Sequence, residues 1–366
     1  MAGKPYFFNF VESSSNKKIK DLTIDPQILI DRMNIEINAS ARTSPTVLIL
    51  TKKADIESDL VGIQLLKNGI DYVKITEEDI PLNFGFNFEI RKNEKSLLYL
   101  RNRRINPRNI KIVLFRYFDL KFLNYYTGIF QAFFAQQWYQ AFNCLRITLN
   151  SIWINDSQKT FDAENRLGQL VMAQRIGLNI PETAITNLIL DGKRFLRRYP
   201  KSIMKVLHHH EISLKQRSFR FLTKNMDLDH LLSFEDLVYA PVIFQKKIEN
   251  DSEIRVTVVG DKVFTCKLSV KDKNKYSDLH KIKKGKIVFK EIKLGKKMEK
   301  LCIKLNRQLG LLVSSVDFVQ DKNGGLFFLE INPIGDWYWI EKQTNLPITK
   351  SMFDFMDGIL NKRLRT

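Results

Sequence analysis

The chain has 366 residues, with 59 Lys and Arg against 40 Asp and Glu, which gives a formal net charge of +19. Hydrophobic residues make up 44% of the sequence, enough to build real cores, so the composition excludes an intrinsically disordered chain. No apolar run is long enough to span a membrane, and the first residues lack the apolar stretch of a signal peptide. Three scattered cysteines, Cys144, Cys266 and Cys302, have neither a disulfide nor a metal-binding spacing. We therefore expect a cytoplasmic protein without a membrane segment.

The positive charge is distributed unevenly along the chain, with 10 Lys and Arg against 4 Asp and Glu at residues 191–230. Residues 261–300 hold 14 Lys against 5 Asp and Glu, a local net charge of +9. Such a surface attracts polyanions, including nucleotide phosphates and acidic peptides. A basic nucleic-acid-binding protein is one interpretation, but no helix-turn-helix, zinc-finger or RRM signature accompanies the charge. Nucleic acid is therefore an alternative partner and not the main one.

The first strongly apolar segment follows a polar stretch, residues 1–45, that reads as an extension and linker. Residues 46–51 (TVLILT) form a compact apolar run, as expected of a buried strand. A helical pattern then ends at Asn68-Gly69, and residues 70–75 form a second strand. A strand, a helix and a strand in this order predict a βαβ unit with parallel strands. We assign residues 46–150 to an N-terminal α/β domain.

Two further subdomains are expected, at residues 151–240 and 241–366. In the N-terminal part, residues 125–149 predict a helix whose Phe and Trp side chains recur at helical spacing, as in a core stripe. In the second half, residues 162–175 predict a helix that ends before Gly177. Apolar runs between turn residues predict strands at 96–100, 111–115, 202–206, 242–245, 255–259, 263–266, 313–319 and 326–331, with a helix at 297–309.

Three oxygen-bearing side chains fall in the last predicted hairpin. Asp317 lies on one strand and Glu330 and Asn332 lie on its partner, with an Asn323-Gly324 turn signal between them. Period-two alternation places Glu330 and Asn332 on one face, with Asp317 opposite them if the hairpin closes at that turn. Two carboxylates and an amide are ligands that Mg²⁺ accepts alongside phosphate oxygens. The alternative is that this face is simply solvated.

Several charged residues precede that hairpin. Lys205 lies inside an apolar strand, where a buried ammonium needs an anion; alternatively, its ammonium reaches solvent at a sheet edge. The segment Gln245-Lys246-Lys247-Ile248 follows another apolar run and offers backbone hydrogen-bonding groups that suit a base. Glu253 and Arg255 share one face of the next strand, as the two partners of a structural ion pair would.

The order of these residues along the chain resembles that of the ATP-grasp ligases. The resemblance covers residues 151–350 and is most specific at Asp317 and at residues 329–333 (LEINP). It implies an α/β (α+β) chain with an ATP-grasp fold and an N-terminal α/β pre-ATP-grasp domain. It also implies two cofactors, ATP and Mg²⁺, with Asp317, Glu330 and Asn332 holding the metal ion against the phosphates.

The same resemblance implies roles for the basic residues. Lys205 would contact the α- and β-phosphates, and Arg255 would stabilise charge on the transferring phosphoryl group. Arg166 would be a third catalytic residue, at a position where many relatives carry a lysine with a different donor geometry. The nucleotide-binding residues that the resemblance implies are Lys205, Gln245, Lys246, Lys247, Ile248, Glu253 and Asn332, and residues 245–248 would frame the adenine.

Within that superfamily, the sequence is similar to the microviridin-type (graspetide) peptide maturases. The similarity rests on residues 153–155 (WIN), 163–166 (AENR), 180–183 (IPET) and 335–341 (GDWYWIE). It implies a macrocyclase that activates Asp or Glu side chains of a ribosomally made precursor peptide as acyl phosphates. Thr or Ser hydroxyls would then attack to form an ester, or Lys amines to form an amide. It also implies an acidic precursor peptide as partner and, by analogy alone, a homodimer.

Residues 4–12 (KPYFFNFVE) resemble the Pro-Phe-Phe leader segment of the precursor peptides that these enzymes modify. If this segment forms a helix, its apolar side chains would lie on one face that suits a groove on the enzyme. Because the segment is tethered to the enzyme, its effective concentration would be raised. An unrelated N-terminal arm is the alternative. The leader-like residues are Pro5, Phe7, Phe8, Phe10 and Val11.

Two other functions stay open at this point. One is an ATP-grasp amino-acid or glutamate ligase of the RimK-like type, acting on a protein tail or a small molecule. The other, from a different class, is a basic nucleic-acid-binding protein with a degenerate nucleotide fold. Salt-sensitive binding to nucleic acid without ATP turnover would favour the second.

Overall fold

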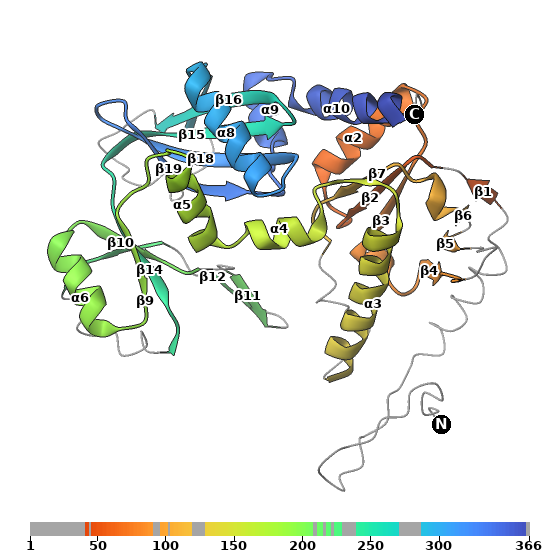
Figure 1. Cartoon of the computed structure of the whole chain (residues 1–366), viewed down its shortest axis with the longest axis horizontal. Helices are drawn as coiled ribbons and strands as arrows, with labels where there is room; N and C mark the ends of the chain where they lie inside the picture. Colours follow the sequence, from red (N-terminus) through yellow and green to blue (C-terminus); the bar gives the residue numbers. More distant parts are fainter. Residues whose placement is uncertain are drawn as a thin grey trace, which may run out of the picture. The chain divides into compact units, whose positions relative to one another are not determined.

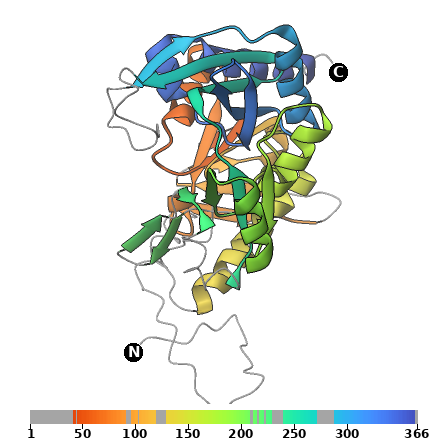
Figure 2. The same cartoon turned by 90° about the vertical axis from the view of Figure 1, so that its left-hand side faces the viewer.

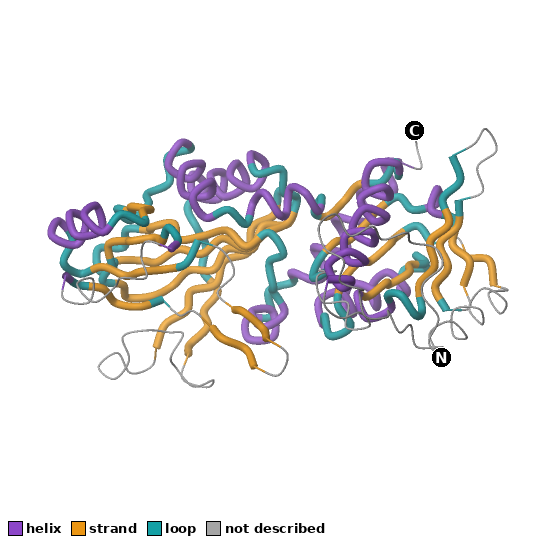
Figure 3. The backbone as a smooth tube through the Cα atoms, turned by 90° about the horizontal axis from the view of Figure 1, so that it is seen from below, coloured by secondary structure: helices purple, strands orange, loops and turns teal. Residues whose placement is uncertain are grey.

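The computed structural model describes residues 41–43, 45–90, 96–101, 103–118, 129–207, 211–214, 217–220, 223–228, 239–270 and 287–363. The leader-like residues lie outside these ranges, so that hypothesis stays a prediction. No helix in the described ranges is long and apolar enough to cross a membrane. The chain divides into two compact units, one formed by residues up to Asp55 with Leu65–Ile152, the other by Ile56–Gln64 with Trp153–Thr366. Helices and strands are both abundant along the chain (Figure 3).

A mostly parallel sheet forms the centre of the first unit. Its strands, in the spatial order β3-β2-β7-β8, are Tyr72–Thr76, Val47–Thr51, Ile112–Phe115 and Ile152–Ile154. Strand β2 is buried along its whole length and pairs in parallel with β3 and β7, which explains its uninterrupted apolar sequence. Helix α2 (Ile56–Lys67) connects β2 to β3, as the βαβ prediction required.

A second sheet and a long helix complete the first unit. The sheet has the order β1-β6-β5-β4, with bounds Ala41–Thr43, Arg103–Ile105, Leu97–Leu100 and Phe84–Asn87. Helix α3 (Ile129–Thr148) carries the predicted aromatic stripe. The Phe142 ring lies 5.3 Å from that of Phe84 and 4.7 Å from that of Phe118, centroid to centroid, so the stripe belongs to a core. Two short 3₁₀ helices span Glu77–Asp79 and Pro107–Asn109.

The second unit contains a four-stranded antiparallel sheet that carries Lys205. Helix α6 (Ile189–Arg198) lies against this sheet (Figure 1). Its Leu196 is buried together with Phe244 and Met226 of the sheet, and the whole molecule is shown from another side in Figure 2. Strand β14 begins just after the subdomain boundary expected at residue 240, yet it pairs with strands that precede that boundary. The strands, in the order β13-β10-β14-β9, are Lys224–Met226, Ser202–Lys205, Val242–Lys246 and Thr183–Thr186, and a separate hairpin pairs β11 (Glu211–Leu214) with β12 (Arg217–Arg220).

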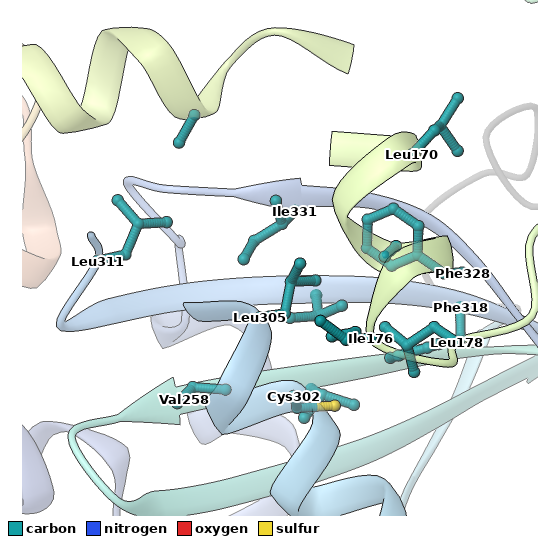
Figure 4. Close-up of a cluster of buried hydrophobic side chains, with 14 of the residues drawn as sticks. Leu170, Ile176, Leu178, Val258, Cys302, Leu305, Leu311, Phe318, Phe328 and Ile331 are labelled. Atoms are coloured by element: carbon teal, nitrogen blue, oxygen red, sulfur yellow. The ribbon is translucent and has the colours of Figure 1, made fainter. Parts of the chain in front are cut away.

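The largest sheet of the second unit is a five-stranded antiparallel sheet that includes the strands labelled β15, β16, β18 and β19 in Figure 1. Its two faces differ in the side chains that they carry. One face is apolar and packs against helices α5 (Arg166–Arg175) and α8 (Lys296–Gln308), with Phe318, Phe328 and Ile331 fully buried (Figure 4). The other face carries charged side chains. The strands, in the order β17-β16-β15-β18-β19, are Ile287–Glu291, Lys262–Val270, Asn250–Val259, Val313–Asp321 and Leu326–Asn332, and the remaining helices are α4 (Ser157–Ala163), α9 (Tyr338–Thr344) and α10 (Ile348–Arg363).

Candidate active site on the charged face of the sheet

Three charged residues form a row across the five-stranded sheet. Arg255 on β15 is in register with Asp317 on β18, which is in register with Glu330 on β19. Residues directly opposite each other on neighbouring strands point to the same face, so the three side chains lie together. Asn332, two residues beyond Glu330, shares that face.

Strand β19 contains one extra residue beside this row. Phe318 is paired with Phe328 and Asp317 with Glu330, so the register shifts by one between the two pairs, and Leu329 is the additional residue of a β-bulge. Strict alternation would place Phe328 and Glu330 on the same face. Because of the bulge, Phe328 is buried in the core while Glu330 stays partly exposed on the charged face. The bulge therefore places Glu330 on the charged face although the core residue Phe328 lies only two positions before it.

Asp317 is the centre of a small hydrogen-bonded cluster. Its Oδ2 lies 2.7 Å from Nη1 of Arg255 and accepts a second hydrogen bond, 2.8 Å long, from Nδ2 of Asn332. Arg255 also donates through Nη2 to the main-chain oxygen of Asp336 at 3.4 Å. The Nε of Arg255 is buried and has no hydrogen-bond partner in the structure. A mostly enclosed guanidinium with an unused N–H is suited to receive an anionic ligand.

Arg166 and Glu330 form a second ion pair on the same face. Nη2 of Arg166 lies 3.3 Å from Oε2 of Glu330, and Nη1 donates to the main-chain oxygen of Val206 at 2.8 Å. Arg166 is the first residue of helix α5, whose N-cap residue Asn165 accepts a 2.9 Å bond from the N–H of Gly168. Arg166 thus links the carboxylate on β19 to the end of β10, directly after Lys205.

Lys205 lies within electrostatic reach of this cluster. Its ammonium donates to Oε1 of the buried Gln245 at 3.2 Å, and Gln245 in turn donates to Oγ1 of Thr183 at 3.0 Å. Burial lowers the pKa of Lys205; the Glu330 carboxylate opposes this shift and the Arg166 guanidinium adds to it. Glu253 and Asp317 also act on the Lys205 pKa in the raising direction. The candidate nucleotide and metal residues therefore share one electrostatic environment.

The segment after Gln245 is engaged differently. Lys246 forms an ion pair with Glu182 at 3.3 Å, and Nζ of Lys247 donates to Oδ1 of Asn225 at 3.1 Å. The main-chain N–H groups of Lys246 and Lys247 donate to the oxygens of Glu182 and Lys201. Ile248 is half-buried. These two N–H groups are already hydrogen-bonded. An adenine base bound at this segment would therefore have to contact other main-chain groups.

Two residues that hold the site in place were missed in the sequence. The buried amide of Asn155 donates to the oxygens of Val313 and Pro333 and accepts from the N–H groups of Leu312 and Val313, so it ties the start of β18 to the end of β19. Gln169 on α5 binds the backbone of Ile331 in the same manner. A sequence signal existed for Gln169, because it falls at helical spacing from the buried Ala173 and Ile176.

The oxygen donors of this face fit a divalent cation. In the ranges that the structure describes, no three His, Cys, Asp or Glu side chains gather as a metal site. The candidate set instead combines two carboxylates, Asp317 and Glu330, with the amide of Asn332. This set suits Mg²⁺, which binds through one or two carboxylates and completes its coordination with water and phosphate oxygens.

Comparisons with known proteins agree with this geometry. The family model of the RimK-like ATP-grasp domain matches residues 164–356. Tetrahydromethanopterin:alpha-L-glutamate ligase from Methanocaldococcus jannaschii is 22% identical over 312 residues, covering 82% of this chain and 95% of that protein.

Two solved structures share the fold over most of the chain. The macrocyclase MdnC from Microcystis aeruginosa, bound with its precursor peptide MdnA, superposes with a TM-score of 0.77 at 22% identity, covering 87% of this chain and all of that one. The RiPP-associated ATP-grasp ligase from Chryseobacterium gregarium, in complex with ADP and a leader and core peptide, has a TM-score of 0.73 at 23% identity, covering 86% and 96%. These likenesses confirm the predicted ATP-grasp fold. Because the matched domain spans more than half of the chain and includes the whole charged row, the protein belongs to the RimK-like ATP-grasp family and is an ATP-grasp ligase.

Proposed function

We propose that this ligase closes rings within a ribosomally made precursor peptide, by activating Asp or Glu side chains for attack by Thr or Ser hydroxyls or by Lys amines. The observation that carries the proposal is the row Arg255, Asp317 and Glu330, which joins a carboxylate-binding cation to two metal-type carboxylates. Support for a peptide substrate comes from the MdnC and Chryseobacterium gregarium structures, which are complexes with peptides.

Asp317, Glu330 and Asn332 are the residues that would hold Mg²⁺. The ion would neutralise the charge of the ATP phosphates when bound. In the structure Asp317 and Glu330 are already paired with Arg255 and Arg166. These two arginines therefore hold the carboxylates oriented on the same face before any ligand arrives.

The basic residues would stabilise the negative charge of the phosphates and of the acyl phosphate. A carboxylate is a poor acyl donor because its charge is delocalised, so its oxygen first attacks the γ-phosphorus, giving an acyl phosphate and ADP. Lys205 would bind the α- and β-phosphates, where its charge is partly desolvated and hence more effective. Arg255 would use its unpartnered Nε–H and its Nη groups to stabilise the acyl phosphate. A hydroxyl or amine of the same peptide then attacks the acyl carbon, and phosphate leaves.

An acidic peptide suits the charge of the protein. The formal charge of +19 attracts Asp- and Glu-rich segments and favours their association at low ionic strength. The leader-like residues near the N-terminus would supply a tethered recognition segment. We further propose, by analogy, that the active form is a homodimer.

A second candidate function is supported by one comparison. The glutamate ligase of Methanocaldococcus jannaschii aligns with 82% of this chain, which favours an amino-acid or glutamate ligase that uses the same charged face. The difference lies in the acceptor, because a glutamate ligase joins a free amino acid to another molecule. The non-enzymatic alternative is a basic protein that binds nucleic acid and does not catalyse ligation.

Mass spectrometry of the products, together with assays of ADP formation and of nucleic-acid binding, separates the three functions. The protein is incubated with ATP, Mg²⁺ and either an acidic precursor peptide encoded beside its gene or free glutamate with candidate acceptors. Loss of one water per ADP formed supports ring closure, and recovery of that water under mild base identifies an ester. Gain of a glutamate residue supports the second candidate. Salt-sensitive binding of DNA or RNA with no ADP formed contradicts both ligase functions.

A further inference from the structure

We propose that Trp339 and Phe289 form a subsite beside Arg255 for a large apolar or aromatic side chain that flanks the activated carboxylate of the peptide substrate. This inference rests on the proposed ligase function and names a feature of the substrate that the function alone does not specify. The pair Trp339 and Phe289 is called the aromatic shelf.

The exposure of Trp339 is unusual for its position. Trp339 is 39% exposed, whereas Trp337 and Ile340 in the same short segment are buried at 0% and 1%. Its ring meets that of Phe289, on strand β17, at 5.8 Å between centroids and 72° between planes, an edge-to-face arrangement. An exposed indole with an ordered aromatic neighbour offers a ready apolar surface.

The shelf adjoins the cation that would hold the reacting carboxylate. Cζ of Arg255 lies 5.8 Å from the centre of the Trp339 ring, close enough for a cation–π contact. The same guanidinium binds Asp317 and the main-chain oxygen of Asp336, and its buried Nε has no partner. A carboxylate that reaches Arg255 therefore brings its neighbouring side chain within range of Trp339. Arg255 would thus bind the carboxylate of the substrate, and the adjacent Trp339 would contact the neighbouring apolar side chain.

The backbone that presents Trp339 is firmly held. Oε1 of Glu57 accepts hydrogen bonds of 3.2 Å from the N–H groups of both Trp337 and Tyr338. The indole N–H of Trp337 donates to Oγ1 of Thr349 at 3.0 Å. Just before this segment, Gly335 has φ +59°, and a Cβ there would lie 3.0 Å from the backbone of Ser314 and Ser315. Because the segment is fixed before ligand binding, stacking a substrate side chain on the shelf costs little ordering entropy.

The expected preference follows from the energetics of aromatic contacts. A ring stacked on Trp339 gains an aromatic contact in addition to the burial of its apolar area, so peptides with and without a ring at that position should differ by about tenfold in affinity, or about 1.4 kcal/mol. A small polar side chain at the same position would leave the shelf in contact with water. The shelf thus acts as a specificity determinant, while Arg255 selects for negative charge.

Calorimetric titration of the full chain, loaded with Mg²⁺ and a non-hydrolysable ATP analogue, tests the proposal. The probes are acetylated tetrapeptide amides of sequence Gly-Phe-Glu-Gly and Gly-Ser-Glu-Gly, which share the carboxylate and differ in its neighbour. The Phe peptide should bind about tenfold more tightly to the wild-type protein. Phe289→Ala and Trp339→Ala should remove most of that difference, and Trp339→Phe should retain it.

Controls distinguish this inference from the proposed function. Tyr139→Ala, which removes an aromatic side chain that is 51% exposed on α3, should keep the tenfold preference. Three results would overturn the proposed subsite. The wild-type protein could bind both peptides equally, the preference for the Phe peptide could survive in Phe289→Ala and Trp339→Ala, or neither peptide could bind. Formation of ADP with the precursor peptide is measured separately, so a failed shelf with intact ring closure leaves the ligase function standing. Phe289→Ala leaves the contact between Trp339 and Arg255 in place and covers the case in which Trp339→Ala does not fold.

Discussion

The side chain of Gln169 binds both main-chain groups of Ile331, the residue between Glu330 and Asn332. Nε2 donates to the oxygen of Ile331 at 2.9 Å, and Oε1 accepts from its N–H at 3.1 Å. Strand β19 is the edge of its sheet, so the outward groups of Ile331 have no neighbouring strand. Gln169 takes the place of that strand, and through Ile331 it fixes the spacing of the two metal-type side chains.

Gln169→Ala should therefore affect both stability and metal binding. The substitution leaves the main-chain groups of Ile331 and the oxygen of Ala163, a third partner of Gln169, without their bonds. Each unsatisfied buried group costs about 1–3 kcal/mol, so with three such groups we expect a loss of at least about 3 kcal/mol in the free energy of unfolding. Magnesium dependence of ATP turnover should shift to higher concentration. Gln174→Ala, an exposed glutamine on the same helix, is the matched control, and equal behaviour of the two variants would contradict the positioning role.

Asp317→Asn and Glu330→Gln should abolish ATP turnover while the chain stays folded. Each change keeps the size of the side chain but removes a negative charge from the candidate metal set. We expect a loss of about 100-fold or more in kcat, the range seen when a single electrostatic group is removed from an active site. The rates are measured by ADP release across a magnesium titration, and folding by circular dichroism.

A stability difference between these two variants is also expected. Arg255 is only 13% exposed, so Asp317→Asn leaves a mostly buried guanidinium without its anion, whereas Arg166, the partner of Glu330, is 22% exposed. Asp317→Asn should thus be the less stable variant in denaturant unfolding. Glu291→Gln, an exposed change on β17, serves as the control for both. Wild-type turnover in either site variant would remove the metal assignment.

The charged face of the hairpin could be predicted because its residues lie close together in the sequence. Alternation along a strand and one turn signal are enough to bring Asp317 near Glu330 and Asn332, and the register has this pairing. The bulge at Leu329 could not be predicted, since a single extra residue leaves no mark in an apolar run. Contacts between residues far apart in the sequence could not be predicted either. The pairs Arg166 with Glu330 and Gln169 with Ile331 join residues more than 160 positions apart, and no local pattern specifies which distant group a helix will face.

Deleting residues 1–20 tests the leader-like segment, which only the sequence supports. We expect the shortened protein to lose activity on a core peptide that lacks its own leader. A synthetic peptide of residues 4–12, added in trans, should restore activity only at concentrations that approach the effective concentration of the tethered segment, on the order of millimolar for a short flexible linker. A second variant, Phe7→Ala with Phe10→Ala in the full chain, controls for the loss of length. Unchanged turnover after the deletion would identify the segment as an unrelated arm.

The three free cysteines should differ sharply in reactivity. Burial raises the pKa of Cys302 to about 12 and also raises that of Cys266, so neither forms the reactive thiolate near neutral pH. Cys144 is partly exposed on α3. Titration of the native protein with a chromogenic disulfide reagent should therefore label Cys144 first, with the other two reacting only on unfolding. Cys144→Ser should remove the fast phase; rapid labelling of Cys266 or Cys302 in that variant would show that the sheet and its helix open readily.

The affinity for ATP should depend on pH through Lys205. Burial lowers the pKa of its ammonium below the usual value of 10.5, and only the charged form attracts phosphate oxygens. As pH rises, affinity should therefore begin to fall below the range in which an ordinary lysine titrates. Lys205→Arg, which stays charged, should bind ATP with no decline over that range, although its different geometry lowers the plateau. Lys205→Ala should lose about 1.5–3 kcal/mol of binding at neutral pH and show no pH dependence from this group. Fluorescent-nucleotide titrations from neutral to alkaline pH measure all three, and parallel wild-type and Lys205→Arg curves would contradict the assignment of Lys205 to the phosphates.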